Sequence, residues 1–277
     1  MLGKLAKVTA ADGDYEGGKK LFVQAEEALG GQPGDGEKDW WNTWLKIQFD
    51  RAWMHYDFSA VEGIRTALEP IRPVMERLGE LDTLSEYYFL LPTLYFRRDG
   101  YRMNDEIMRY STLALETSMK TDNLELRTRT NFGYGFCNFL LGNFEPAFHY
   151  MGEGLKLAEQ IGYVEQQIFN LTYLAAAHRG AGNLDECKQV AERCLALCER
   201  EGATSYAATA RANLGWIAWK QNDIRQAKAL NLAAMAGWSA HYPFRWFGLW
   251  TLIDLSLLSL RTEDAVGYAR MLKAPGQ

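Results

Sequence analysis

The chain has 277 residues, of which 48% are hydrophobic, and its formal net charge is -5 at pH 7. The hydrophobic fraction is sufficient for a substantial buried core. The acidic balance argues against a protein that reads a phosphate backbone, because such proteins concentrate Lys and Arg on one face, and we therefore expect no nucleic-acid partner.

The predicted elements are all helices. Long stretches without Pro, rich in Ala, Leu, Glu, Lys and Arg, are typical of helices, and the seven prolines mostly lie where a helix would begin or end. In chain order, the expected helices are 2–11, 15–29, 39–56, 58–78, 82–98, 103–120, 123–141, 144–161, 163–181, 184–201, 204–221, 224–240, 244–260 and 262–273. We expect a flexible glycine-rich loop at 30–38, and a structural turn at 241–246 with Pro243 at a helix start.

An internal repeat organises these helices. Segments 141–147, 181–187 and 221–227 align without gaps, and each is a polar turn with a capping Asn or Asp before a helix. Small residues recur in the same register at intervals of 12 and 7. The four triplets are Ala6, Gly18 and Ala25; Gly135, Ala147 and Gly154; Ala175, Cys187 and Cys194; and Gly215, Ala227 and Ala234.

Small side chains that face one another let two helices of a pair approach closely. We therefore predict an all-α fold, a right-handed α-solenoid of roughly seven antiparallel helix pairs with a period of about 40 residues, of the tetratricopeptide type. We expect a single repeat domain over 1–277, because the repeat continues along the chain. Neither end has a polar cap, so we also expect the chain to be a fragment of a larger protein.

Two tryptophan-rich segments carry a further resemblance. They are Trp40-Trp41-Asn-Thr-Trp44 with the helix that follows, and Arg211-Ala-Asn-Leu-Gly-Trp216-Ile-Ala-Trp219. With the 40-residue spacing, the chain resembles the C-terminal tetratricopeptide region of bacterial signalling ATPases, such as multidomain adenylate/guanylate cyclases and transcription activators. The resemblance implies a sensor or interaction arm that regulates activity housed elsewhere and holds no catalytic residues.

The residue types and their spacing also argue against catalysis or metal binding by this chain. The four histidines lie in different repeats, and none is beside a Ser or Cys in a nucleophile context. Cys187, Cys194 and Cys198 share one helix face but lack a fourth ligand, so small apolar packing is the favoured interpretation over a metal site with His178. We expect no catalytic residue, no metal and no cofactor.

A ligand groove is the candidate site. In this architecture the first helix of each pair lines an inner surface, where aromatic anchors with Arg and Lys are typical of peptide recognition. The residues expected there are Arg129, Phe132, Phe136, Phe139, Thr172, Arg179, Thr209, Trp216, Trp219 and Lys220. The alternative for each aromatic residue is packing between neighbouring repeats.

The expected function is a non-catalytic protein- or peptide-binding or sensor scaffold that regulates a linked ATPase, cyclase or transcription-activator module. Its partner would be a protein, a peptide or a linked domain of the same polypeptide. The alternatives are a small-ligand sensor and an oligomerisation module that pairs through terminal repeats. No signal peptide precedes the first helix, and the most apolar run, 249–260, is too short to span a bilayer. We therefore expect a cytoplasmic protein without a membrane partner.

Overall fold

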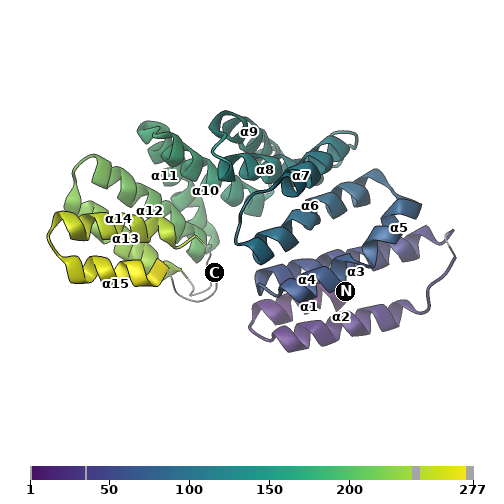
Figure 1. The fold of residues 1–277 in the computed structure, drawn as a ribbon. Coiled ribbons are helices and arrows are strands. Elements are labelled where there is room, and N and C mark those ends of the chain that lie inside the picture. The colour runs from purple at the N-terminus through teal and green to yellow at the C-terminus, as the bar shows by residue number, and fades with distance from the viewer. Residues whose placement is uncertain (1, 35, 239–243, 273–277) are drawn as a thin grey trace. The chain divides into compact units, whose positions relative to one another are not determined.

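The structure, a computed structural model, describes residues 2–34, 36–238 and 244–272. These residues form fifteen α-helices and no strand (Figure 1). The helices are α1 (Leu2–Ala11), α2 (Tyr15–Leu29), α3 (Lys38–Asp57), α4 (Val61–Leu68), α5 (Ile71–Leu78), α6 (Leu81–Asp99), α7 (Asp105–Ser118), α8 (Leu124–Leu140), α9 (Phe144–Gln160), α10 (Val164–Ala181), α11 (Leu184–Glu201), α12 (Thr204–Lys220), α13 (Ile224–Gly237), α14 (Trp246–Leu258) and α15 (Thr262–Leu272). The predicted all-helical fold is confirmed.

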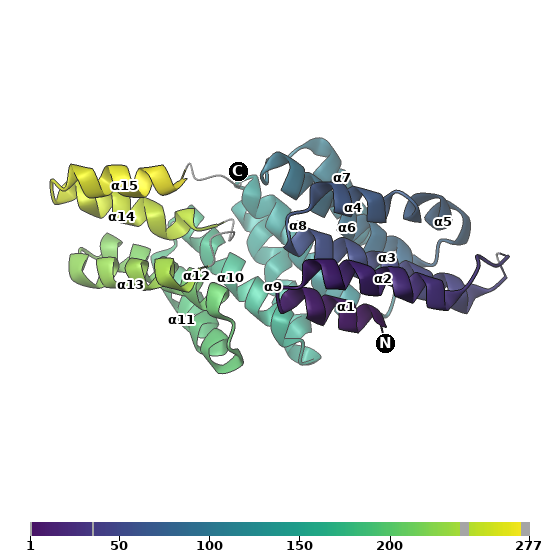
Figure 2. The ribbon, with the colours of Figure 1, turned by 90° about the horizontal axis from the view of Figure 1, so that it is seen from below.

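The helices belong to two compact units, Met1–Leu140 and Leu141–Gln277, and each is described by itself. Consecutive helices pack as hairpins within a unit, as α1 with α2 and α12 with α13 show in both views (Figures 1 and 2). The first helix of a pair also packs against the first helix of the next pair. We call these the first-layer helices. They are α1, α3, α6 and α8 in the first unit, and α10, α12 and α14 in the second.

Left-handed turns end the helices at a regular interval in the middle of the chain. Gly142, Gly162, Gly182 and Gly202 all have positive φ, between 70° and 80°, and Asn222 follows with φ 62°. Glycine has no Cβ penalty in this region, and Asn tolerates it better than most residues. These residues stop each helix and let the chain reverse after about five turns of helix.

One predicted helix is wrong. The expected helix 58–78 is two helices, α4 and α5, separated at Glu69 and Pro70. Pro70 has no N–H to donate to Thr66, and its ring clashes with that carbonyl, so a continuous helix is broken there. The predicted turn at 241–246 lies partly outside the described residues, because His241 and Pro243 are not among them.

The small residues of the repeat are buried in the helix packing. All twelve members of the four triplets lie inside. A Cβ at Gly18 would lie 2.9 Å from the Ala6 carbonyl oxygen, so α1 and α2 are in contact at that point. In the second unit the Cys187 thiol donates to the Ala175 carbonyl over 3.3 Å and joins α11 to α10. Close backbone approach at these positions sets the spacing of each hairpin.

Candidate functional site

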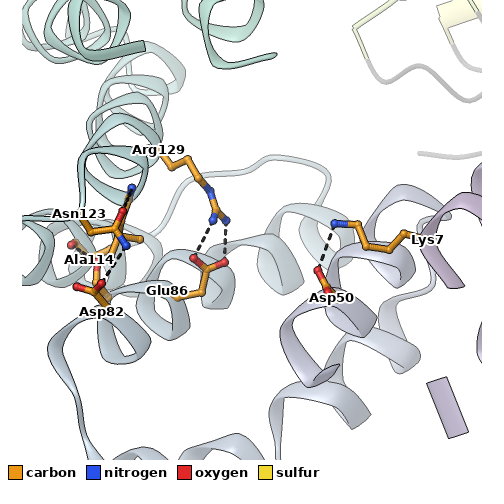
Figure 3. Close-up of polar contacts among 9 residues, drawn as sticks. Lys7, Asp50, Asp82, Glu86, Ala114, Asn123 and Arg129 are labelled. Carbon is orange, nitrogen blue, oxygen red and sulfur yellow. Dashed lines mark hydrogen bonds and ion pairs between the residues drawn. The ribbon is translucent and has the colours of Figure 1, made fainter. Parts of the chain in front are cut away.

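In the first unit, an arginine and a glutamate join two first-layer helices. Arg129 on α8 donates two parallel hydrogen bonds to Glu86 on α6, of 2.7 and 2.8 Å (Figure 3). The guanidinium carbon lies 4.9 Å from the ring centre of Phe89 and 5.7 Å from that of Trp53. The two charged side chains are each less than one fifth exposed. Arg129 is therefore a guanidinium that aromatic rings flank and that a carboxylate of the same chain neutralises.

Other polar pairs occupy the same layer of the first unit. Lys7 on α1 lies 3.2 Å from Asp50 on α3, and Asn123 donates to Asp82 over 2.9 Å (Figure 3). The side chains of these two pairs bind one another across neighbouring repeats. This part of the layer is held together by its own polar contacts.

The three phenylalanines predicted for the groove lie along α8. Phe136 is buried and stacks against Phe132, with ring centres 5.8 Å apart, and it packs at a tilt against Phe139, at 6.1 Å. It also meets Phe96 of α6 edge to face. Phe136 thus packs between two first-layer helices, whereas Phe132 and Phe139 are only partly buried.

In the second unit, Arg179 has a different environment from Arg129. It lies in the last turn of α10, and its guanidinium carbon is 5.4 Å from the ring centres of both Trp216 on α12 and Phe247 on α14. Its hydrogen bond goes to the Oδ1 atom of Asn213 on α12, at 3.4 Å. Among the described residues, no carboxylate forms an ion pair with it.

Burial lowers the pKa of the Arg179 guanidinium. Loss of hydration lowers the pKa of Arg179 to about 10, against the opposing effect of the Asp254 charge. The Cys187 thiol is itself kept neutral, because burial raises its pKa to about 12. A cation that is still charged at neutral pH therefore lies where three first-layer helices meet.

The remaining predicted residues of the second unit fall into two groups. Trp219 is partly buried and Lys220 is exposed, with the Lys220 ammonium 4.2 Å from the Trp219 ring centre. Thr172 and Thr209 are buried, and each hydroxyl has a partner inside the packing, at Cys194 for Thr172 and at the Trp238 indole for Thr209. A ligand on the described surface would reach Trp219 and Lys220 but not the two threonines.

The cysteines of α11 are packing residues in this structure. Cys194 and Cys198 are buried, with their sulfur atoms 3.8 Å apart, and His178 stacks on Phe148 with ring centres 4.2 Å apart. No group of three or more His, Cys, Asp or Glu side chains suited to a metal ion occurs in the described part of the chain. Within the same residues, no helix combines the length and the hydropathy that crossing a bilayer requires.

Sequence reasoning missed three residues that shape the site. Glu86 completes the Arg129 pair, while Asn213 and Phe247 contact Arg179. None of the three is in register with the predicted groove residues, so the repeat spacing gave no signal for them. Phe247 could only have been noticed through the aromatic cluster that precedes α14.

Comparison with known proteins supports the fold. A tetratricopeptide repeat family model matches residues 167–239. A Rap protein complexed with competence and sporulation factor is similar in structure, with a TM-score of 0.74 and 12% identity over 98% of this chain and 74% of that chain. NprR in complex with its cognate peptide NprX gives a TM-score of 0.69 and 12% identity, over 98% of this chain and 75% of that chain. No curated protein sequence matches the chain.

A signalling ATPase is also among the similar structures. It is the signal transduction ATPase with numerous domains from Pyrococcus horikoshii, which has a tetratricopeptide repeat sensor. The TM-score is 0.64 and the identity 16%, over 98% of this chain but only 40% of that protein. The expected resemblance to the helical repeats of signalling ATPases is therefore confirmed at the level of the fold.

Proposed function

We propose that this tetratricopeptide-like helical-repeat protein is a non-catalytic scaffold that binds a peptide across the first-layer helices of its second unit. The observation that carries the proposal is the partly exposed Arg179 guanidinium of α10, which the buried rings of Trp216 on α12 and Phe247 on α14 flank. Trp219 and Lys220, at the end of α12, form a second contact between an aromatic ring and a cation, and there Lys220 is exposed and Trp219 is partly buried. The Rap and NprR structures, each a complex with the ligand named above, support a peptide or a signalling factor as the kind of partner.

The chemistry of these residues suits a peptide. Tryptophan and arginine dominate binding free energy at interfaces, because they bury large surfaces with little loss of side-chain entropy. Packed helices lie about 10 Å apart, so three first-layer helices present a row of roughly 20 Å. An extended chain rises about 3.3 Å per residue, so a segment of about six residues would cross that row.

We further propose that the scaffold regulates a linked signalling module. The similarity to a tetratricopeptide repeat sensor of a signalling ATPase supports this, although this chain spans only 40% of that protein. A ligand can shift such a module only through different affinities for two arrangements of the repeats. Small-angle scattering with saturating peptide would then show a changed radius of gyration, and an unchanged value would remove this part of the proposal.

Two variants test the binding proposal. Trp219→Ala removes an aromatic anchor, and Arg179→Gln removes the partly exposed cation. Each should weaken binding of a selected peptide by at least about tenfold, which is the usual effect of losing a hot-spot side chain. Arg225→Gln is the matched control, because Arg225 is exposed on α13 and makes the same change in charge. Equal affinities for all four proteins would refute the proposal.

One observation favours self-association as a second function. The last helix pair exposes several large apolar side chains, among them Trp250 at 52%, Leu257 at 51% and Leu258 at 68% exposure. Exposed apolar groups gathered on one pair of helices are a feature of contact surfaces. Sedimentation equilibrium of the wild type and of Trp250→Ser with Leu258→Ser would test it. The protein concentration would be about 100 µM, which is on the order of the dissociation constant of a weak complex. A wild type that is monomeric at this concentration would exclude this function.

A further inference from the structure

Neighbouring helix pairs of this chain meet through a contact that recurs in the same register. The fourth residue of a pair's second helix is covered by the next first-layer helix, at the residue five positions before the left-handed residue of the turn that follows. The contact packs a side chain on a small residue, so the two repeats approach closely there. It occurs as Met54 on Gly18, Ile217 on Cys187 and Leu255 on Ala227.

Val8 has this covering position on α1. It lies five residues before Gly13, whose φ is 101°, in the turn that leads into α2. The three covering residues named above are between 2% and 4% exposed, whereas Val8 is 56% exposed. Leu5, about one helical turn earlier, is 50% exposed. Among the described residues, α1 therefore presents one half of a repeat contact without its complement.

The last helix pair presents the other half. Ala265 is the fourth residue of α15, the position that a following repeat covers in the pairs above. In the preceding pair, Trp219 packs beside this position, three residues before the left-handed turn residue. Leu257 has the same place relative to Leu260 and is 51% exposed. The two halves of one contact thus lie on α1 and on the last pair, and each exposes large apolar side chains, which is typical of contact surfaces.

The charges on the two halves are complementary in the same register. Between the first two pairs, Lys7 on α1 lies 3.2 Å from Asp50 on α3. Counted from the left-handed residue of each turn, Asp254 on α14 has the position of Lys7, and Lys4 on α1 has the position of Asp50. The ion pair therefore recurs between the last pair and α1 with its two charges exchanged. Lys4 is exposed and Asp254 is partly buried.

We infer that copies of this chain associate head to tail, with α1 of one copy packed on α14 and α15 of the next copy in the place of a following repeat. Val8 covers the surface at Ala265 and Leu257, and Lys4 pairs with Asp254. The inference deepens the self-association given above as the second function and rests on it. It differs from a symmetric pairing of two last helix pairs, because the two copies contribute different faces.

Two complementary variants test these faces on the whole chain. Val8→Asp disrupts the face on α1, and Leu257→Asp disrupts the face on the last pair. At about 100 µM, on the order of the dissociation constant of a weak complex, each variant alone should lose the association of the wild type. An equimolar mixture should form a complex of one copy of each, because the intact α1 of Leu257→Asp meets the intact last pair of Val8→Asp. Sedimentation equilibrium with one variant fluorescently labelled measures it.

Val23→Asp is the matched control. Val23 on α2 is 51% exposed, and its counterpart Leu232 on α13 is still 41% exposed although a helix pair packs on each side of that repeat. This position therefore faces away from neighbouring repeats, and Val23→Asp should associate as the wild type does. All three substituted side chains are more than half exposed, so each variant should keep the wild-type Tm.

Disulfide cross-linking gives a second measurement that does not depend on the aspartate variants. A mixture of Val8→Cys and Leu257→Cys chains, oxidised with copper phenanthroline, should give a linked dimer of the two. A mixture of Val23→Cys and Leu257→Cys should not. The natural cysteines are buried, so they add little background. A cross-link that is equally strong in both mixtures, or absent from the first, would overturn the inference.

The outcomes separate the inference from the function on which it rests. A wild type that is monomeric at this concentration refutes both. If the wild type associates, and Val8→Asp associates equally or the mixture of the two aspartate variants stays monomeric, the second function stands and the head-to-tail contact is refuted.

Discussion

The hydroxyl of Tyr15 lies 2.7 Å from Nδ1 of His55, and this contact joins α2 to the last turn of α3. His55 is only 7% exposed. Burial, together with the nearby positive charges of Arg51 and Lys19, lowers the pKa of His55 from 6.5 to about 4. The imidazole is therefore neutral in the folded protein down to mildly acidic pH.

This relationship predicts a loss of stability in mild acid. Between pH 6.5 and 4 the unfolded state binds a proton at His55 that the folded state does not, so the free energy of unfolding falls as pH falls through this range. The full loss is about 3.5 kcal/mol, at about 1.4 kcal/mol for each pH unit of displacement, and most of it is reached by pH 4.5. Urea unfolding at pH 7.5 and 4.5 would measure it. His55→Gln should flatten the dependence, and His149→Gln, at an exposed position, should not.

Close packing of the first hairpin gives a second prediction. Gly18→Ala should destabilise the protein by about 1–3 kcal/mol, because the new methyl group would lie 2.9 Å from the Ala6 carbonyl oxygen and 3.0 Å from the Ala10 methyl group. Gly152→Ala on α9 is the matched control, since a Cβ there meets nothing within 4 Å. That control should stabilise by about 0.5–1 kcal/mol through helix propensity. Thermal or urea unfolding of both variants checks the contrast, and equal effects would contradict it.

The helices of this fold were largely predictable from sequence, for a physical reason. From α8 to α13, each turn has its own local signal, a Gly or Asn that adopts left-handed backbone, and these signals need no information from distant residues. The break at Pro70 was also local, and the continuous apolar pattern on both sides of it concealed it.

The site was less predictable, because burial depends on neighbours that the repeat spacing does not specify. Phe136 and Trp216 lie on the expected helices, yet each is largely covered by side chains of another repeat. Arg129 and Arg179 are both arginines on first-layer helices, the first in one unit and the second in the other. Only the structure shows that Glu86 neutralises the first, while the second has Asn213 in place of a carboxylate.

Arg129→Met should therefore destabilise the protein. It leaves the partly buried carboxylate of Glu86 without its bidentate partner, and we expect a loss of about 1–3 kcal/mol. A double-mutant cycle with Glu86→Gln isolates the pair, and it should give a coupling energy of at least about 1 kcal/mol. A coupling energy near zero would mean that the aromatic contacts alone hold Arg129.

The same substitution at Arg179 should act in the opposite direction. Arg179→Met replaces a partly buried cation that forms no ion pair by an apolar side chain of similar length, so the unliganded protein should be as stable as the wild type or more stable by about 1 kcal/mol. Differential scanning calorimetry without ligand measures it. A clear loss of stability would show that Arg179 stabilises the packing of α10, α12 and α14 and would contradict a role in ligand binding.

The most direct measurement of the central claim is peptide binding. Peptides of six to ten residues (a span of roughly 20–33 Å when extended) would be selected from a random library against the whole chain. Fluorescence anisotropy would then give their affinities for the wild type, Trp219→Ala, Arg179→Gln and Arg225→Gln. The account predicts peptides that bind the wild type and Arg225→Gln alike and the other two at least about tenfold more weakly. Selected peptides that bind all four proteins equally, or a selection that enriches none, would contradict it.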